Sequence, residues 1–504
     1  MTSLIADLDL AFKALSPRGS DWIAILPELG VAGLSLFALL QAMVVPERLR
    51  WLIPATARAG LVLIAVMALA PEAAWRQLPE TQLFGGLIRH NLPMDGVRMV
   101  FLASALLTSL MAGRFLTARG AGLADYHHVL LAVTASFMLL VQSDHFVPFF
   151  VSLEAAAVGL YVLVGYLRRS EASLEAGVKF LVAGGLSSAF LLMGMVLVYG
   201  TLGGPGGGDS LAFPVIAKAL AAGKGTALTL AGVAMIMGGA AFKLGAFPFH
   251  SWIPDVYQGA PTPTTAYLAT ASKAAGALSL LLLVTGPFAP LAAKVAPALA
   301  GLALLTLLAG NLAALATSDI KRALALSGVS HAGFLLAAVT VAVARPEATA
   351  FNYSAENVVV LYLLAYVIGT FLTLHSLAGV PAAEDHRRPL ISLRGLIRRS
   401  PSLTAGLCFG IGSLAGVPPS VGFVTKLLVL VLLVQAGLWW VLAAALIGVA
   451  VSIHYYFGIL REAVVRPGED REETAPLETG TVSRFIIGAL SLGTLVAGAV
   501  MLAR

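Results

Sequence analysis

Long apolar stretches, separated by short polar segments, recur along nearly the whole chain. Leu29–Val44, Phe190–Tyr199 and Leu427–Val434 are examples, and Ala and Gly extend each of them on both sides. About 20 apolar residues span the hydrocarbon core of a bilayer as a helix, which satisfies its own backbone polar groups. Only 12% of the 504 residues are charged, whereas a soluble domain has about 25%. The sequence therefore predicts an all-α, polytopic membrane protein.

Hydropathy windows predict about fourteen transmembrane helices. Their approximate ranges are 22–45, 51–70, 97–118, 126–142, 146–167, 176–200, 228–250, 263–286, 293–316, 321–343, 357–380, 403–435, 436–460 and 481–502. No polar segment between them is long enough for a catalytic domain. The one cysteine, Cys408, excludes an intrachain disulfide and a cysteine-ligated cluster on this chain. We expect the function to reside within the membrane, with no cofactor and no metal bound to this chain.

The basic residues indicate how these helices are oriented. If the N-terminus lies outside, the inside loops hold about seventeen Lys and Arg residues and the outside loops about six. Because cytoplasmic loops carry the excess of Lys and Arg, we expect a multi-pass protein of a bacterial inner membrane with both termini in the periplasm. The net charge of +6 then reflects contacts with lipid headgroups, and not with nucleic acid. Met1–Ser20 has no long apolar stretch, so no cleavable signal peptide is expected.

Two of the predicted helices contain Pro and Gly in their middle. One includes residues 242–248 (FKLGAFP) and the other residues 416–422 (GVPPSVG). Interrupted helices at matching places in two halves mark the ion path of a transporter. The seventh and twelfth helices lie an odd number of spans apart, which reverses direction, so we expect two inverted five-helix repeats. The expected organisation is helices 1–3 in residues 1–125, helices 4–8 in residues 126–286, helices 9–13 in residues 293–460, and a loop with the last helix in residues 461–504.

Six ionisable residues within the predicted helices are candidate site residues. They are Glu154, Lys179, Lys243, Lys273, His331 and Lys426. A charge at mid-membrane costs several kcal/mol, so such residues tend to face a hydrated interior and to have a function. A desolvated lysine can release its proton, whereas a carboxylate about 4 Å away favours the charged form by about 4 kcal/mol at an effective dielectric constant near 20. Arginine does not deprotonate in this range. The pattern therefore favours proton handling by lysines near Glu154.

Structural roles remain open for several of these residues. Lys179 lies a turn or two from the inside surface and can extend to the headgroups. His331 can be a hydrogen-bonded packing residue, and Asp255 is expected in a loop, where it more often caps a helix than carries ions. Lys243 is less easily explained by packing, because it stands beside the break in the seventh helix.

Residues 242–276, FKLGAFPFHSWIPDVYQGAPTPTTAYLATASKAAG, resemble the signature of the antiporter-like subunits of the proton-pumping NADH–quinone oxidoreductase, respiratory complex I. Phe150–Tyr166, Gly177–Gly200, Asn311–Leu336 and Leu414–Leu430 are also similar to this family. Among the antiporter-like subunits, the chain is most similar to the N subunit. The L and M subunits usually have a histidine-containing motif where Lys273 stands, and the M subunit typically has a glutamate in place of Lys426. The chain also ends without the long lateral helix of the L subunit.

The resemblance implies a role for each candidate residue. Glu154 and Lys243 would form the coupled pair of one half-channel, and Lys179 would modulate that pair. Lys273 and His331 would continue a hydrated central axis, and Lys426 would serve the second half-channel. The chain itself would perform no redox step, although it would be a subunit of a proton-translocating NADH:quinone oxidoreductase.

The resemblance also implies partners. They would be the other membrane and peripheral subunits of complex I, including the M subunit and small membrane subunits, together with lipid. NADH, FMN, iron–sulfur clusters and quinone would be bound by those partner subunits. An alternative is a subunit of a multi-subunit cation/proton antiporter or of a membrane-bound hydrogenase, which share the lysines and broken helices. A scaffold that has lost pumping would lack the axis lysines, which are present.

Overall fold

The computed structural model of the chain describes residues 18–70, 82–90, 94–203, 211–382, 384–465 and 476–503. Most of Met1–Ser20, for which no signal peptide is expected, lies outside the described residues, as do parts of the polar segments around residues 71–96, 201–226 and 462–484. Within the described residues the chain is almost entirely helical, which confirms the predicted all-α, polytopic class.

Within the described residues, twelve helical segments are long and apolar enough to cross a membrane. Nine of them are the single helices α3 (Leu26–Val44), α5 (Met94–Thr117), α7 (Phe146–Val164), α8 (Glu171–Leu202), α10 (Ala227–Leu244), α15 (Ile320–Ala344), α16 (Ala355–Gly379), α20 (Trp439–Val464) and α21 (Thr481–Ala503). The other three are α4 (Leu52–Leu69) with the short helix η1 (Glu47–Leu49) before it, α14 (Ala292–Leu315) with the short helix η5 (Ala289–Leu291) before it, and the run of α12 (Thr262–Tyr267), the π-helical turn η4 (Leu268–Ser272) and α13 (Lys273–Thr285).

Shorter apolar helices occupy the remaining predicted ranges. They are α6 (Ala124–Leu140) and the pair α18 (Pro401–Ala415) and α19 (Val421–Gln435). Each predicted range therefore overlaps a helix, whereas the number of membrane crossings and the two repeats stay predictions. The remaining helices of the described residues, all short, are α2 (Gly19–Ala24), η3 (Phe84–Gly86), α9 (Phe213–Ala221), α11 (Trp252–Gly259), η6 (Leu390–Leu393) and α17 (Leu396–Arg399).

Two small antiparallel hairpins join helices at one end of the bundle. In the first, β1 (Gln82–Leu83) pairs with β2 (Ile88–Arg89), with Gln82 opposite Arg89. In the second, β3 (Thr349–Ala350) pairs with β4 (Tyr353–Ser354), with Thr349 opposite Ser354. The segments that contain these two hairpins carry few basic residues, in keeping with the periplasmic side on which the sequence places them.

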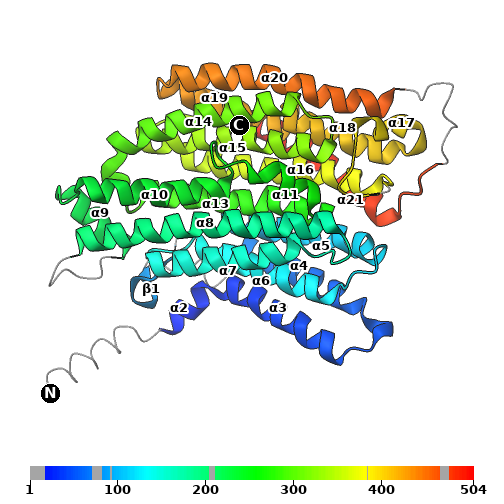
Figure 1. Cartoon of the computed structure of the whole chain (residues 1–504), viewed down its shortest axis with the longest axis horizontal. Coiled ribbons are helices and arrows are strands. Elements are labelled where there is room, and N and C mark those ends of the chain that lie inside the picture. Colours follow the sequence, from blue (N-terminus) through cyan, green and yellow to red (C-terminus); the bar gives the residue numbers. More distant parts are fainter. Residues whose placement is uncertain are drawn as a thin grey trace.

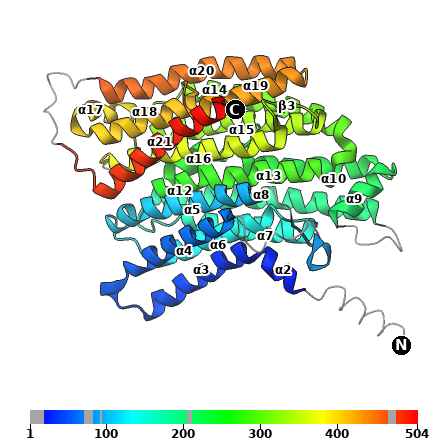
Figure 2. The same cartoon turned by 180° about the vertical axis from the view of Figure 1, so that it is seen from behind.

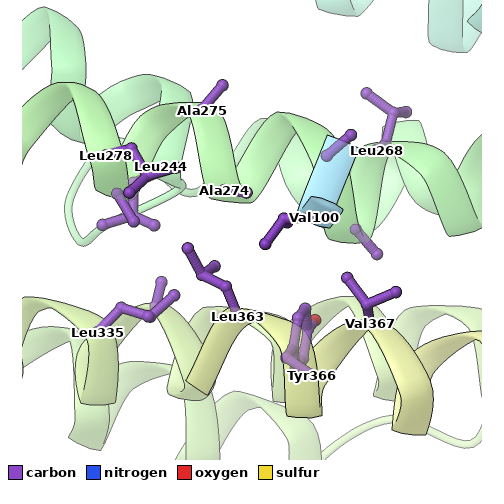
Figure 3. Packing of buried hydrophobic residues seen from close by; sticks show 14 of the residues in the cluster. Val100, Leu244, Leu268, Ala274, Ala275, Leu278, Leu335, Leu363, Tyr366 and Val367 are labelled. Atoms are coloured by element: carbon purple, nitrogen blue, oxygen red, sulfur yellow. The ribbon is translucent and has the colours of Figure 1, made fainter. Parts of the chain in front are cut away.

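The helices lie side by side, from α3 at one edge of the molecule to α20 at the other (Figure 1). From behind, α21 runs obliquely across α16 and α18, which it contacts (Figure 2). The outer helices α3 and α8 expose large apolar side chains such as Met43 and Val182, whereas the most apolar 18 consecutive residues of α15 are all buried inside the protein. Apolar side chains fill the space between the α12–α13 run and α16, where Ala274 lies across from Leu363 and Leu268 lies across from Val367 (Figure 3). The interior helices α13 and α15 are thus shielded from lipid, and they carry the candidate residues Lys273 and His331.

The two predicted helix breaks have the same backbone arrangement. Helix α10 ends because Gly245 adopts φ +82°, and the amide groups of Gly245 and Ala246 donate back to the Ala241 carbonyl. Helix α18 ends because Gly416 adopts φ +83°, and the amide groups of Gly416 and Val417 donate to the Gly412 carbonyl. This is the common glycine ending of a helix, and it leaves the last carbonyl groups unbonded within the helix. Both helices therefore end inside the molecule with a negative pole.

Candidate functional site

Glu154 and Lys243 form an ion pair beside the first break. Glu154 projects from the middle of α7, and Lys243 lies in the last turn of α10. The distance from Lys243 Nζ to Glu154 Oε1 is 3.6 Å, and the side chains are 10% and 24% exposed. The Ser188 hydroxyl of α8 donates to the same carboxylate oxygen at 2.6 Å. The structure thus brings together the predicted pair of Glu154 and Lys243. Ser188, which the sequence analysis did not identify, holds Glu154 in place.

Lys273 occupies the interior of the molecule, one helix away from this pair. Its side chain is 2% exposed, and Nζ donates to the carbonyl oxygen of Leu244, the last residue of α10, at 3.3 Å. The ammonium group therefore lies at the negative pole of the broken helix, which favours a cation. A π-helical turn, η4, directly precedes Lys273, and such turns are frequent at functional sites.

Gly276 permits the close approach of the helix that carries Lys273. A Cβ atom at this position would lie 2.6 Å from the Leu244 Cα and would also clash with the peptide bond between Lys243 and Leu244. Only a residue without a side chain allows α13 to rest directly on the end of α10.

Lys426 repeats this arrangement at the second break. Its side chain is 5% exposed, and Nζ donates to the carbonyl oxygens of Leu414 and Ala415 at 2.7 and 3.0 Å. These are the last carbonyls of α18, while Lys426 itself lies on α19 beyond the break. The ring of Phe334 lies 5.4 Å from the ammonium, within cation–π range. No acidic partner of Lys426 is found among the described residues.

His331 lies between the two buried lysines and is held by tyrosines. Its Nδ1 is 2.8 Å from the hydroxyl oxygen of Tyr362, and its Nε2 is 3.2 Å from that of Tyr456. The ring of Tyr366 lies 4.7 Å from the imidazole ring, centroid to centroid. Sequence reasoning missed these tyrosines, because a tyrosine in an apolar helix does not by itself indicate a polar partner.

Lys179 is placed differently from the other lysines. Its side chain is 47% exposed, and Nζ contacts Glu175 at 2.7 Å and Asp255 at 3.0 Å, not Glu154. Arg322 also pairs with Asp255, at 2.7 Å. Burial by itself raises the pKa of Asp255, but the hydrogen bonds and charges of Lys179 and Arg322 hold it below its usual value. Asp255 lies in the first turn of α11 and not in the expected loop, and any effect of Lys179 on the Glu154–Lys243 pair stays a prediction.

Further buried charges lie near the ends of the helices. Asp385, in the segment after α16, pairs with Lys321 at 3.3 Å and with Arg388 at 2.9 Å, and it accepts hydrogen bonds from the backbone and hydroxyl of Thr262. Burial by itself raises the pKa of Asp385, but the charges of Lys321 and Arg388 and these hydrogen bonds hold it well below its usual value. Lys321 is fully buried in the first turn of α15.

The first three long helices also contain charges that sequence reasoning passed over. Arg98 and Glu28 pair at 2.8 Å, each 1% exposed, and Arg58 bonds to Ser109. Each of these charged residues lies inside a predicted span, so the signal was present. Among the described residues, no group of three or more His, Cys, Asp or Glu side chains is arranged to hold a metal ion.

Comparison with known proteins places this site in a family. The model of the family described as "NADH:quinone oxidoreductase/Mrp antiporter, TM" matches residues 143–452. The chain is 39% identical over 492 residues to NADH-quinone oxidoreductase subunit N 1 of Opitutus terrae, which covers 95% of each chain. It is 35% identical over 454 residues to NAD(P)H-quinone oxidoreductase subunit 2 of Synechococcus elongatus, covering 89% of this chain and 82% of the relative.

Solved structures agree with these relatives. A chain of respiratory complex I from Thermus thermophilus superposes with a TM-score of 0.75 at 30% identity, covering 94% of this chain and 96% of that one. A chain of the Mrp complex from Dietzia superposes with a TM-score of 0.78 at 19% identity over 94% of both chains, which shows a shared fold. The chain is a multi-pass inner-membrane protein, and it belongs to the family of antiporter-like N subunits of NADH–quinone oxidoreductase.

Proposed function

We propose that this chain translocates protons as the N subunit of an NADH–quinone oxidoreductase, along a path that contains Glu154, Lys243, Lys273, His331 and Lys426. The observation that supports this most strongly is the ion pair of Glu154 and Lys243 beside a helix end, with Nζ and Oε1 3.6 Å apart. A charge pair about 4 Å apart is worth about 4 kcal/mol at an effective dielectric constant near 20. Moving one charge against 100 mV costs about 2.3 kcal/mol. The energy of one such ion pair is therefore enough to move one proton against a membrane potential of about 100 mV.

The order of proton transfer follows from the positions of the lysines. Protons enter from the cytoplasmic side and reach Lys273, which lies at the end of the helix that carries Lys243. When the neighbouring quinone-reducing module moves Glu154 away from Lys243, the charged state of Lys243 loses its support, and its proton passes to the central axis. His331 then connects Lys273 with Lys426, from which the proton leaves. Lys179, which lies on α8, modulates the Glu154–Lys243 pair through its own ion pair with Asp255 of α11.

The redox chemistry in this proposal belongs to other subunits. NADH, FMN, the iron–sulfur clusters and quinone are bound by partners, and this chain contributes only the membrane path. The M subunit and small membrane subunits are its neighbours within the bilayer. The alternative of a cation/proton antiporter or a membrane-bound hydrogenase has weaker support. The Mrp chain and a chain of an archaeal sulfane sulfur reductase are 19% and 20% identical, a likeness of fold alone.

The proposal is tested by replacing either member of the pair in the complete complex. In membrane vesicles, Lys243→Ala and Glu154→Ala are expected to lower the number of protons pumped per electron, while the assembled complex still reduces quinone in the presence of an uncoupler. Lys294→Ala, at an exposed position in the first turn of α14, is the matched control and keeps the wild-type ratio. Unchanged ratios in both pair variants would refute the proposal.

A further inference from the structure

A small cavity lined by hydroxyl groups lies between the central axis and the ends of the helices that bear the basic loops. Its volume is about 10 Å³, which is room for about one water molecule. The hydroxyl-bearing residues that line it are Tyr257, Thr265, Ser327, Tyr366, Thr370 and Thr373. We call this space the hydroxyl cavity. All six residues are at most 5% exposed, so the cavity lies in the interior of the protein.

The hydroxyl of Thr370 lines this cavity beside the Tyr366 hydroxyl, and among the described residues it makes no hydrogen bond that meets the usual limits of distance and angle. Three neighbouring hydroxyls already use their protons. Thr265 donates to Tyr257 O at 2.9 Å, Ser327 to Leu324 O at 2.8 Å, and Thr373 to Gly369 O at 2.8 Å. Each of these three oxygens still offers a lone pair. One water that accepts from Thr370, donates to one of these three oxygens and donates to the Tyr366 hydroxyl would make three hydrogen bonds, the usual number for a buried water.

The inner side of the hydroxyl cavity adjoins Lys273. Ala269 lines the cavity, and Lys273 follows it by one helical turn on the same face. A Cβ atom on Gly328 would lie 3.1 Å from the Tyr366 hydroxyl and 3.8 Å from Lys273 Nζ. The Tyr366 hydroxyl and the ammonium group therefore both lie beside the bare α-carbon of Gly328, and any larger residue would intrude between the cavity and the lysine.

The outer side of the hydroxyl cavity adjoins a much larger polar cavity of about 1160 Å³, which we call the vestibule. Asp255 and Gln258 of α11 and Arg322 of α15 line the vestibule. Tyr257 of α11 and Leu324 of α15 line the hydroxyl cavity instead. Helices α11 and α15, which contact each other, thus contribute residues to both spaces.

We propose that the hydroxyl cavity holds one relay water through which Lys273 takes up protons from the vestibule. This inference rests on the proposed function and adds the uptake step to it. When Nζ of Lys273 has given up a proton, the Tyr366 hydroxyl transfers its own proton to that nitrogen and takes one from the relay water. The water regains a proton from the vestibule across the α11–α15 contact. Only N–H and O–H bonds change, and each donor is restored. Thr370 positions the water and does not itself transfer the proton.

The test compares substitutions that differ in one hydroxyl, made in the complete complex. Thr370→Val keeps the shape of the side chain and removes its hydroxyl, and Tyr366→Phe removes the transferring group. Both are expected to lower the proton-to-electron ratio toward that of Lys273→Ala, with uncoupled quinone reduction retained. Thr370→Ser restores the ratio because it restores the hydroxyl. Thr340→Val is the matched control, since Thr340 is buried in α15 away from the cavity and bonds only to Leu336 O.

Two results would overturn the inference. One is a wild-type ratio in Thr370→Val under conditions where Lys243→Ala lowers the ratio, which leaves the proposed function in place and removes the uptake step. The other is a high-resolution cryo-EM map of the assembled wild-type complex without water density among Thr370, Ser327 and Thr373. This second measurement does not depend on the stability of any variant. Unchanged ratios in Lys243→Ala and Thr370→Val together would instead reject the proposed function itself.

Discussion

His331 shows at the scale of single residues how the protein controls a titratable group. A neutral imidazole has one nitrogen that donates and one that accepts. Because both ring nitrogens contact tyrosine hydroxyls, at 2.8 and 3.2 Å, one tyrosine donates to the ring and the other accepts from it. Exchanging these roles reverses the direction of all the hydrogen bonds without moving a heavy atom. The arrangement therefore suits a group that passes protons in sequence between Lys273 and Lys426.

Removing either hydroxyl should therefore impair transfer. We predict that Tyr362→Phe and Tyr456→Phe each leave a buried ring nitrogen unpaired, at a cost of about 1–3 kcal/mol. The proton-to-electron ratio of the vesicle-bound complex falls, whereas its assembly is retained. Tyr353→Phe, in the hairpin strand β4, serves as the control. If both axis variants pump like this control, His331 is a packing residue and not a relay.

The broken helices explain, at the scale of elements, why cations are tolerated inside this protein. Lys273 bonds to the last carbonyl of α10, and Lys426 bonds to the last two carbonyls of α18. A helix that ends at mid-membrane leaves carbonyl groups free and carries about half a negative charge at its end. The glycine at each break ends the helix, and a lysine from a different helix donates hydrogen bonds to the free carbonyl groups.

The backbone at the second break should be sensitive to a single methyl group. Gly416 has φ +83°, and a Cβ atom there would lie 3.0 Å from Cδ of Lys426. We predict that Gly416→Ala costs about 1–2 kcal/mol from the left-handed backbone alone and displaces Lys426 as well. The thermal midpoint of the purified complex and its pumping ratio both decrease. Gly412→Ala, one turn earlier in α18 with nothing within 4 Å of its Cβ position, is neutral by both measures. Equal effects of the two substitutions would contradict this account.

Asp385 joins distant parts of the whole molecule. It contacts Lys321 at the start of α15, Arg388 in its own segment and Thr262 at the start of α12. These contacts tie the last helix of the first expected repeat to the second. Removing one member of a buried ion pair costs about 3–5 kcal/mol, because the remaining charges have no partner.

We predict that Asp385→Asn destabilises the assembled complex by about that amount, measured as a lower thermal midpoint. Glu384→Gln is the control, since Glu384 is 53% exposed and its partners lie at the surface. The pKa of Asp385 is lowered in the folded protein, so its contribution is complete above the ordinary carboxyl value near 3.9. The contribution is lost only as the pH falls through the lower folded value. A thermal midpoint difference that disappears between pH 6 and 8 would contradict this assignment.

The sequence predicted the helices better than their contacts. Hydropathy is a local property, so each predicted range overlaps a helix, and the two glycine breaks lie where the sequence placed them. The pairing of Glu154 with Lys243 was predicted through the family resemblance. The pairing of Lys321 with Asp385 and that of Lys179 with Asp255 were not, because each joins residues more than 60 positions apart. The place of the Thr370 hydroxyl in the hydroxyl cavity was equally hidden, because helix packing alone decides where a buried hydroxyl lies.

The central claim is that buried lysines of this chain exchange protons during pumping. The proton-to-electron ratio of the vesicle-reconstituted complex with Lys426→Arg tests it most directly. Arginine keeps the positive charge at the end of α18 but does not release its proton in this range. We predict a lowered ratio with quinone reduction retained under an uncoupler. A wild-type ratio in the Lys426→Arg complex would contradict the claim, because a fixed charge would then serve as well as a titrating one.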